Sequence, residues 1–446
     1  MRKVLIVSPR FPPKNAADLH RVRVSLPCYR GFGWAPTILC VDAATADCVD
    51  DPMLAESLPP DVPVTRVRAW SEAMCRRLGF AQLGYRSLVP LYRAGSDILR
   101  RERHDVVFFS TTVFSSLVLG PLWKRRFGCR IVYDFQDPWY SEQSPYTPET
   151  APGGWWRYRL DQWLARHLER FAMRGADHIV SVSESYVRDL LGRHAWLQSS
   201  QFTVLPFAAT EADYAFVRRK PIQQTIFRPD GRTLHWVSAG RAGPDMDAVL
   251  RALFRCVASL RQREPELATR LRLHFVGTNY APPERTYKLV EPIARELGVD
   301  DLVEEVSERL PYFDTIALNE ASDAIVLIGS VHVDYTASKL FSCVLAKKPI
   351  LALFHRDSLV SRLAARFSNV FLATFDESPS EPAFLARVAE GIAWLRAPTF
   401  DASTIDAQLG PWSAEAATGR QCAIFDQVCA GAPSDAAARI ESRALP

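Results

Sequence analysis

The sequence lacks a strong charge of either sign. Its 54 lysines and arginines stand against 50 aspartates and glutamates, which gives a formal net charge of +4. Domains that bind nucleic acid usually concentrate positive charge, so the composition gives no indication of a nucleic-acid partner. A hydrophobic content of 48% and a charged content of 23% are typical of a folded globular protein. At 446 residues the chain is too long for one ordinary core, and we expect two domains.

Cys-x-x-Cys pairs are also missing. The nine cysteines are an odd number and are scattered along the chain. This pattern indicates neither a zinc site nor a framework of disulfides, and it predicts a reduced, cytoplasmic compartment. P-loop, His-Glu-x-x-His and Ser-His-Asp signatures were not found. We therefore expect no metal ion and no cofactor.

Long hydrophobic runs are absent as well. The longest candidate for a membrane span, residues 106–123, is interrupted by serines, threonines and Pro121, and we reject it. The N-terminal apolar run is short and indicates a first strand rather than a signal peptide. Arginines and aromatic residues are frequent between residues 53 and 103. That composition suits either solvated helix faces or a surface that touches anionic lipid, or a lipid-linked phosphate, at the inner face of a membrane.

What the sequence does contain is a regular alternation of apolar strands with amphipathic helices. The alternation occurs on both sides of a polar, turn-rich segment at residues 216–231. It predicts the α/β class, with two Rossmann-like domains built on mainly parallel sheets. We place the first domain at residues 1–215, the linker at 216–231 and the second domain at 232–410. Residues from 431 to 446 show no periodicity and are expected to be disordered.

A strand, helix and strand unit in the second half contains a candidate anion site. An apolar run ends at Gly329, and Ser338 is expected to cap a short helix that has Lys339 in its first turn. Unpaired N–H groups at a helix start attract anions, and a hydroxyl and an ammonium group are added there. A diphosphate would fit this place. The alternative is an ordinary buried unit of this kind with a capped helix.

A second loop in the same domain adds another cation. Gly240 and Arg241 directly follow the strand expected at residues 234–239. In an open α/β sheet the carboxyl ends of parallel strands lie at one edge, so we predict that Arg241 and Lys339 converge on one diphosphate. A glycine turn with a surface arginine is the alternative. The Asp-x-Asp motif that begins at Asp245 is interpreted as a helix cap rather than a metal site, because a periodic apolar helix follows it.

In the first half, Asp137 follows the strand expected at residues 130–135, where α/β sheets hold ligands. A carboxylate at that place is costly for folding unless it caps a turn or has a function. We interpret Asp137 as functional. The alternative is that Asp137 caps the following turn and Trp139 fills the core.

These segments resemble the GT-B glycosyltransferases of the family 4-like type. The resemblance rests on residues 334–349, on the Asp-x-x-Asp-Pro-Trp element at residues 134–139 and on the strand at residues 177–183, and it extends from Lys3 to about Val428. It implies two Rossmann-like domains that face each other across a cleft, with a last helix at residues 411–430 that crosses back to the first domain. It also implies transfer of a sugar from a nucleotide diphosphate sugar to an unknown acceptor, with retention of anomeric configuration.

The resemblance assigns roles to individual residues. Asp334 and Ser342 stand where the family has two glutamates that hold the sugar and the ribose, so the second acid is replaced by serine. Arg241 matches the family's diphosphate arginine, whereas a residue near Met246 stands in place of its lysine. The expected roles are catalytic for His20 and Asp137, acceptor-side for Asn15, Arg21 and Trp139, and donor-binding for Gly240, Arg241, Arg309, Asp334, Tyr335, Ser338, Lys339 and Ser342.

Two other functions remain compatible with the sequence. The serine at Ser342 and the missing lysine near Met246 favour a GT-B scaffold that binds a nucleotide or a partner without catalysis. A nucleotide-sugar epimerase of the same fold is the second alternative. The donor base, the sugar and the acceptor, which could be a glycan, a lipid-linked molecule or a small molecule, are not indicated by the sequence.

Overall fold

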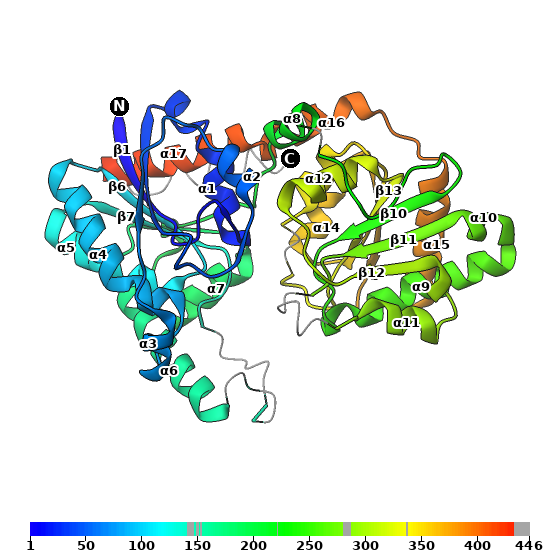
Figure 1. The fold of residues 1–446 in the computed structure, drawn as a ribbon, viewed down its shortest axis with the longest axis horizontal. Helices are drawn as coiled ribbons and strands as arrows, with labels where there is room; N and C mark the ends of the chain where they lie inside the picture. Colours follow the sequence, from blue (N-terminus) through cyan, green and yellow to red (C-terminus); the bar gives the residue numbers. More distant parts are fainter. Residues whose placement is uncertain are drawn as a thin grey trace. The chain divides into compact units, whose positions relative to one another are not determined.

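The computed structural model describes residues 1–140, 147–148, 151, 154–220, 222–279, 287–335 and 338–431. Contacts divide the chain into two compact units (Figure 1). Unit 1 consists of Met1–Ala208 and Ala414–Pro446, and unit 2 consists of Ala209–Ser413. The tail expected to be disordered, residues 431–446, lies outside the described residues apart from Gly431.

Unit 1 is built on a seven-stranded sheet in the order β5-β3-β1-β6-β7-β8-β9, and each neighbouring pair is parallel. Two short strands, β2 (Lys14–Asn15) and β4 (Val49–Asp50), form a separate antiparallel pair. The strands of the main sheet are β1 (Arg2–Val7), β3 (Trp34–Val41), β5 (Val64–Val67), β6 (Val106–Ser110), β7 (Arg130–Phe135), β8 (His178–Ser181) and β9 (Phe202–Val204).

Both faces of this sheet are covered, as the alternation along β1 shows. Leu5 and Val7 pack into one core with helices α4, α5 and α6, whereas Val4 and Ile6 pack into another with α1 and α17. Parallel strands that are buried on both faces have nearly continuous apolar sequences, which is why they are easy to recognise. The helices of unit 1 are α1 (His20–Ser25), α2 (Pro52–Glu56), α3 (Glu72–Arg77), α4 (Leu83–Arg101), α5 (Leu119–Phe127), α6 (Trp155–Met173), α7 (Glu184–Arg193) and α17 (Ala414–Ala430).

Helix α17 follows unit 2 in the sequence but packs in unit 1. The ring of Phe425 lies 5.3 Å from those of Trp34 and Phe108, and the Tyr29 hydroxyl donates to Gln421 Oε1 at 2.6 Å. Unit 1 is therefore assembled from two distant parts of the chain.

Unit 2 is built on a six-stranded parallel sheet in the order β12-β11-β10-β13-β14-β15. Helices α9, α11 and α15 share one large core with the strands. With two α/β units of parallel strands, the predicted fold class is confirmed. The elements of unit 2 are β10 (Leu234–Ala239), β11 (Leu271–Val276), β12 (Val303–Val306), β13 (Ala324–Ile328), β14 (Ile350–His355), β15 (Val370–Phe375), α8 (Glu211–Arg219), α9 (Asp247–Arg263), α10 (Pro265–Arg270), α11 (Val290–Glu296), α12 (Tyr312–Ala321), α13 (Leu340–Leu345), α14 (Leu359–Ala364), α15 (Pro382–Arg396) and α16 (Ile405–Leu409).

The boundary between the units lies earlier than the linker expected at residues 216–231. Contacts place it between Ala208 and Ala209. The reason is helix α8, which carries Phe216 onto Phe313 of α12 with a ring distance of 4.3 Å, so this polar-looking segment is anchored in unit 2. In the described part of the chain, no helix has the length and apolar character needed to cross a lipid bilayer.

Candidate functional site

In unit 2 the loop after β10 brings Gly240, Arg241 and Lys339 together. The Lys339 ammonium group donates a hydrogen bond to the Ala239 carbonyl at 2.7 Å. Gly240 has a φ of +122°, and a Cβ added there would lie 3.0 Å from Lys339 Nζ. Burial lowers the pKa of Lys339, and the positive charge of Arg241 lowers it further. Glycine suits this position because residues with a side chain rarely adopt such a φ, and the close passage of Lys339 leaves little room for one.

Arg241 is engaged by an acid of the following loop. Its guanidinium makes two bonds to Asp245, at 2.8 and 2.7 Å, and lies 6.0 Å from the centre of the Tyr335 ring. Although burial opposes ionisation of Asp245, the bonds from Arg241 and Ser330 lower its pKa. A Cβ at Gly243 would lie 2.0 Å from Arg241 Nη1, so a larger residue there would displace the paired side chains of Arg241 and Asp245. Any anion that binds Arg241 must compete with Asp245.

The helix cap expected at the Asp-x-Asp motif is wrong. Helix α9 begins at Asp247 without a side-chain cap bond, after a short 3-10 turn at Pro244–Met246. Asp245 pairs with Arg241, and Asp247 forms an ion pair with Arg251 at 2.7 Å. Both carboxylates form ion pairs with arginines four residues away and do not cap the start of α9.

The expected cap at Ser338 is also wrong. Helix α13 has six residues, its N-cap is Lys339 with backbone angles in the helical region, and no side chain caps it. Ser338 is exposed in the preceding turn, and Asp334 is exposed as well. Thr336 and Ala337, between them, lie outside the described residues. The positive charge of Lys339, rather than a capped helix start, is therefore the basis for an anion site.

The remaining residues expected to bind the donor are Tyr335, Ser342 and Arg309, and their surroundings differ. Tyr335 is half-buried and stacks on Phe354 with a ring distance of 6.4 Å. Ser342 is half-buried in α13, and its backbone carbonyl accepts a hydrogen bond from the Tyr214 hydroxyl at 2.6 Å. Arg309 is exposed in the loop before α12, with its Cα 3.6 Å from the Cβ position of Gly277 at the end of β11.

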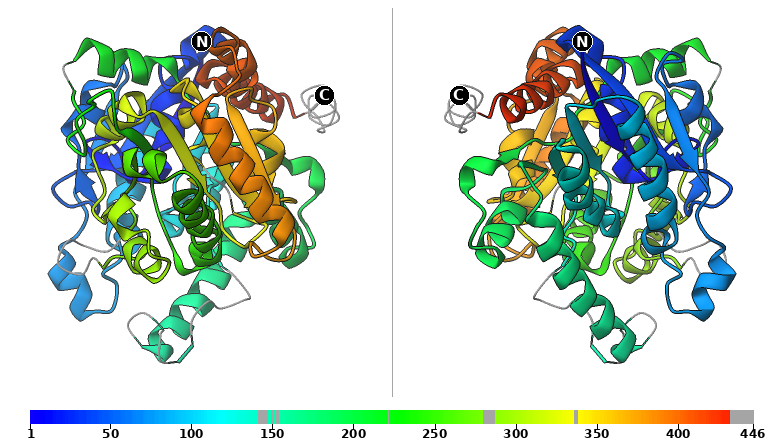
Figure 2. Two further views of the ribbon diagram at one scale, coloured as in Figure 1. Left: turned by 90° about the vertical axis from the view of Figure 1, so that its right-hand side faces the viewer. Right: turned by 90° about the vertical axis from the view of Figure 1, so that its left-hand side faces the viewer.

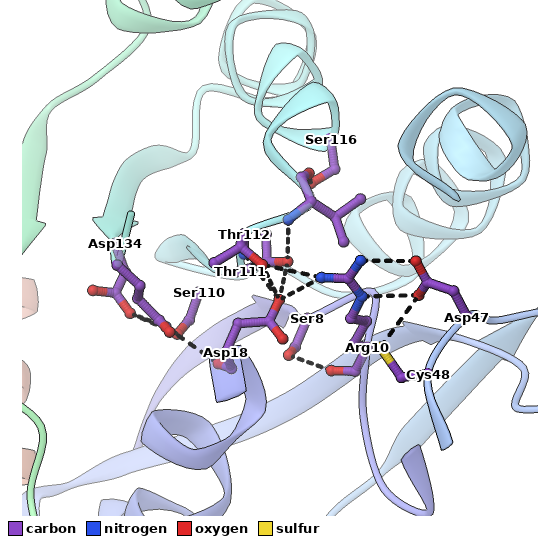
Figure 3. Close-up of polar contacts among 12 residues, drawn as sticks. Ser8, Arg10, Asp18, Asp47, Cys48, Ser110, Thr111, Thr112, Ser116 and Asp134 are labelled. Atoms are coloured by element: carbon purple, nitrogen blue, oxygen red, sulfur yellow. Dashed lines mark hydrogen bonds and ion pairs between the residues drawn. The ribbon is translucent and has the colours of Figure 1, made fainter. Parts of the chain in front are cut away.

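In unit 1 a polar cluster lies at the carboxyl ends of β1, β6 and β7 (Figure 3). Asp18 is 1% exposed, and its Oδ2 accepts from the Thr111 hydroxyl at 3.0 Å and the Thr112 N–H at 2.9 Å. The Nη1 atom of Arg10 lies 3.9 Å from the same oxygen. The Nε and Nη2 atoms of Arg10 donate to the two carboxylate oxygens of Asp47 at 2.8 and 2.7 Å. These bonds fix the loop between β1 and α1.

Arg21 is part of the interior of unit 1. It is 4% exposed, its Nε lies 2.8 Å from Asp134 Oδ2, and its Nη2 donates to the Leu205 carbonyl at 2.6 Å. Asp134 is fully buried and also accepts from Ser110 and Gln136, each at 2.7 Å. The expected acceptor-side role of Arg21 does not fit this arrangement, because an arginine so enclosed serves to neutralise Asp134.

Asp137 lies just beyond this cluster and is exposed to solvent. Partial desolvation by its surroundings and the negative charge of Asp18 raise its pKa to about 6. A carboxyl group with a pKa near the working pH can act as an acid or a base. Asp137 therefore keeps its place as the candidate catalytic carboxylate.

The other residues expected in unit 1 have structural contacts. Trp139 is half-buried and stacks on Phe114 at a ring distance of 5.7 Å, as in the core-filling alternative. His20 is half-buried at the start of α1, where its Nδ1 accepts from Arg23 at 3.4 Å. Asn15 is half-buried in β2 and donates to Asp51 at 3.5 Å.

Sequence reasoning missed the polar cluster of unit 1. The available signal was a polar residue within or directly after each of three apolar strands, namely Ser8, Ser110 and Asp134. Such residues meet at one edge of a parallel sheet. Among the described residues, no group of three or more His, Cys, Asp or Glu side chains is placed to hold a metal ion.

Comparison with known proteins agrees with the resemblance found in the sequence. Residues 20–208 match the family model of the glycosyl transferase 4-like domain. No curated protein sequence matches the chain.

Three solved structures show the same fold at low sequence identity. HepE from Anabaena in complex with UDP has a TM-score of 0.53 and 15% identity over 99% of this chain and 100% of that one. An α,α-trehalose-phosphate synthase (UDP-forming) from Burkholderia xenovorans has a TM-score of 0.58 and 12% identity over 95% and 99%. A putative UDP-N-acetylglucosamine 2-epimerase from Listeria monocytogenes has a TM-score of 0.50 and 12% identity over 97% and 98%. The chain thus has the two-domain GT-B fold of these structures, and its residues 20–208 match a glycosyl transferase 4-like domain, as the resemblance predicted.

Proposed function

We propose that the protein transfers a sugar from a nucleotide diphosphate sugar to an acceptor, with retention of anomeric configuration, and that unit 2 binds the diphosphate. The observation that carries this proposal is that Lys339 lies against the backbone of Ala239 and Gly240, directly before Arg241, at the carboxyl edge of the parallel sheet of unit 2. Two cations placed together attract a doubly charged group more strongly than one helix start does. HepE and the trehalose-phosphate synthase support a uridine nucleotide as the first donor to test.

The chemistry follows from the leaving group. Negative charge grows on the diphosphate as the glycosidic bond breaks, and Arg241 and Lys339 stabilise that charge. Lys339 is held by the Ala239 carbonyl and Arg241 by Asp245, so both are positioned before the donor binds. In unit 1, Asp137 is the candidate group that exchanges a proton with the acceptor. The proposal requires no metal ion and no other cofactor.

Release of UDP from UDP-glucose tests the proposal without knowledge of the acceptor, because abortive transfer to water still frees the nucleotide. Arg241→Ala and Lys339→Ala should each weaken UDP binding about tenfold or more, since each removes a charge-assisted bond worth roughly 1.5–3 kcal/mol. Uridine, which lacks the phosphates, should be affected far less. Isothermal titration of both ligands gives the comparison.

Arg251→Ala is the matched control. Arg251 resembles Arg241 in exposure, 31% against 32%, and in its ion pair with an aspartate four residues away. It lies along α9 instead of in the loop after β10. We expect UDP binding to be unchanged in this variant. Equal losses of UDP and uridine in the Arg241 and Lys339 variants would show that the diphosphate binds elsewhere.

An epimerase is the second candidate, favoured by the structural likeness to the Listeria protein. An epimerase would return a UDP-sugar of altered stereochemistry without net release of UDP. A scaffold that only binds would give neither product. Chromatography of the nucleotide and NMR of the sugar after incubation with UDP-sugars separate the three outcomes.

A further inference from the structure

Helix α6 of unit 1 carries large apolar side chains that are exposed to solvent. Trp156 is 86% exposed, Leu160 61%, Trp163 57% and Phe171 40%. Their spacing places them along one face of the helix. Exposed apolar residues that occur singly need no explanation, but a row of this kind marks an interaction surface.

The exposed charges on α6 itself have one sign. The acids of α6 are withdrawn from the surface, because Asp161 is only partly exposed and Glu169 is 1% exposed and bonded to Arg193 and His194 at 2.9 and 3.0 Å. The exposed charged residues of α6 are all arginines, namely Arg157, Arg159, Arg166 and Arg170.

A second element adds apolar groups in the same region. The segment around α3 exposes Trp70, Met74, Leu78 and Phe80, with Leu78 at 67%. Figures 1 and 2 show α3 and the beginning of α6 toward the same end of unit 1. The sequence offered a lipid-facing surface, as one of two alternatives, only for residues 53–103, and α6 was not part of that hypothesis. Within residues 53–103, Arg86 is buried and donates a hydrogen bond to the Thr45 carbonyl at 2.9 Å, so this arginine is not part of a lipid-facing surface.

We propose that α6 and the α3 segment form a surface by which unit 1 lies on an anionic phospholipid bilayer. Tryptophan and leucine suit the boundary between headgroups and acyl chains, and flanking arginines attract anionic headgroups. A second copy of the chain fits less well, because a two-fold contact through α6 would bring this row of arginines against itself. The proposal is independent of the transferase chemistry, since it uses neither Arg241 nor Lys339.

The test is sedimentation of the full chain with vesicles of phosphatidylcholine alone or mixed with phosphatidylglycerol. We expect binding to the mixed vesicles only, and weaker binding as salt increases. Leu160→Gln with Trp163→Gln should lower the apparent affinity at least tenfold. Arg159→Gln with Arg166→Gln should lower it roughly twentyfold.

Matched control substitutions lie on α5 of the same unit. Leu122→Gln removes another exposed leucine, 42% exposed, and Arg125→Gln removes another exposed arginine. Both controls should bind vesicles like the wild type, and UDP binding should be unchanged in every variant. Three results would overturn the proposal. The wild type could fail to bind anionic vesicles, the controls could lose as much as the α6 variants, or light scattering could show a dimer that the Leu160 and Trp163 changes dissociate.

Discussion

Three carboxylates of unit 1 lie close together in sequence or space but have different surroundings. Asp134 is enclosed and neutralised by Arg21, and Asp18 is enclosed by hydroxyl and backbone N–H donors. Asp137 is exposed, and the charge of Asp18 helps to raise its pKa to about 6. Of the three, only Asp137, which is exposed and has a raised pKa, can change protonation near neutral pH without disturbing the core.

We therefore expect Asp137→Asn to lower turnover with little change in melting temperature. Because its pKa is raised in the folded protein, ionisation of Asp137 opposes folding as pH increases toward and through about 6. Loss of that charge at pH 7.5 should leave stability equal or slightly higher. Turnover of the wild type should change with an apparent pKa near 6, and this step should disappear in the variant.

Asp134→Asn is the control for this prediction. It breaks a buried ion pair and leaves Arg21 without its partner charge, which should cost on the order of 3–5 kcal/mol of unfolding free energy. If Asp137→Asn lowers the melting temperature to a similar extent while activity per folded molecule is retained, Asp137 is a structural residue.

At the scale of elements, the sequence predicts strands better than helix starts. The buried parallel strands are continuous apolar runs, so β1, β6, β10 and β14 could be recognised. The caps expected at Ser338 and Asp245 were wrong because capping signals are local. Asp245 is held by Arg241 and by the distant Ser330, which the local pattern does not contain.

Three adjacent strands of unit 2 contain a buried histidine pair that was also not predicted. His235 Nδ1 lies 3.0 Å from His274 Nε2, and His274 Nδ1 lies 3.0 Å from a Glu304 carboxylate oxygen. Burial lowers the pKa of both histidines. The unfolded chain then binds protons more readily than the folded one, so this contribution to stability is present above the ordinary histidine pKa of about 6.5 and is lost as pH falls below it.

The expected result is a decrease in unfolding free energy between pH 7 and pH 5.5 that is smaller when both histidines are replaced by glutamine. Urea unfolding at several pH values measures it. The exposed His332→Gln serves as control and should leave the pH dependence as in the wild type. If unfolding free energy decreases with falling pH as steeply in the double glutamine variant as in the wild type, other groups cause the acid sensitivity.

At the scale of the whole molecule, the alternation of strands and helices was enough to predict two α/β units. Parallel topology was enough to predict that Lys339 lies beside the loop after β10, although binding of a diphosphate there stays a prediction. The unit boundary and the enclosure of Arg21 could not be predicted in the same way. Both depend on contacts between residues far apart in sequence, such as Phe216 with Phe313 and Arg21 with Asp134.

The return of α17 to unit 1 makes the stability of that unit depend on the end of the described chain. Phe425 is fully buried against Trp34, Phe108 and Tyr29, all from the first quarter of the sequence. Phe425→Ala leaves a cavity and should cost about 3–5 kcal/mol of unfolding free energy. Because these partners all belong to unit 1, the loss should be confined to that unit.

Amide hydrogen exchange can locate the loss. In Phe425→Ala, faster exchange is expected in β1, β3 and β6, whereas β10 and β11 should exchange as in the wild type. Phe313→Ala, which removes a fully buried ring from unit 2, should give the reverse pattern. If either substitution accelerates exchange equally in both sheets, the two units unfold as one cooperative body. The division of contacts at Ala208 would then not be a division of stability.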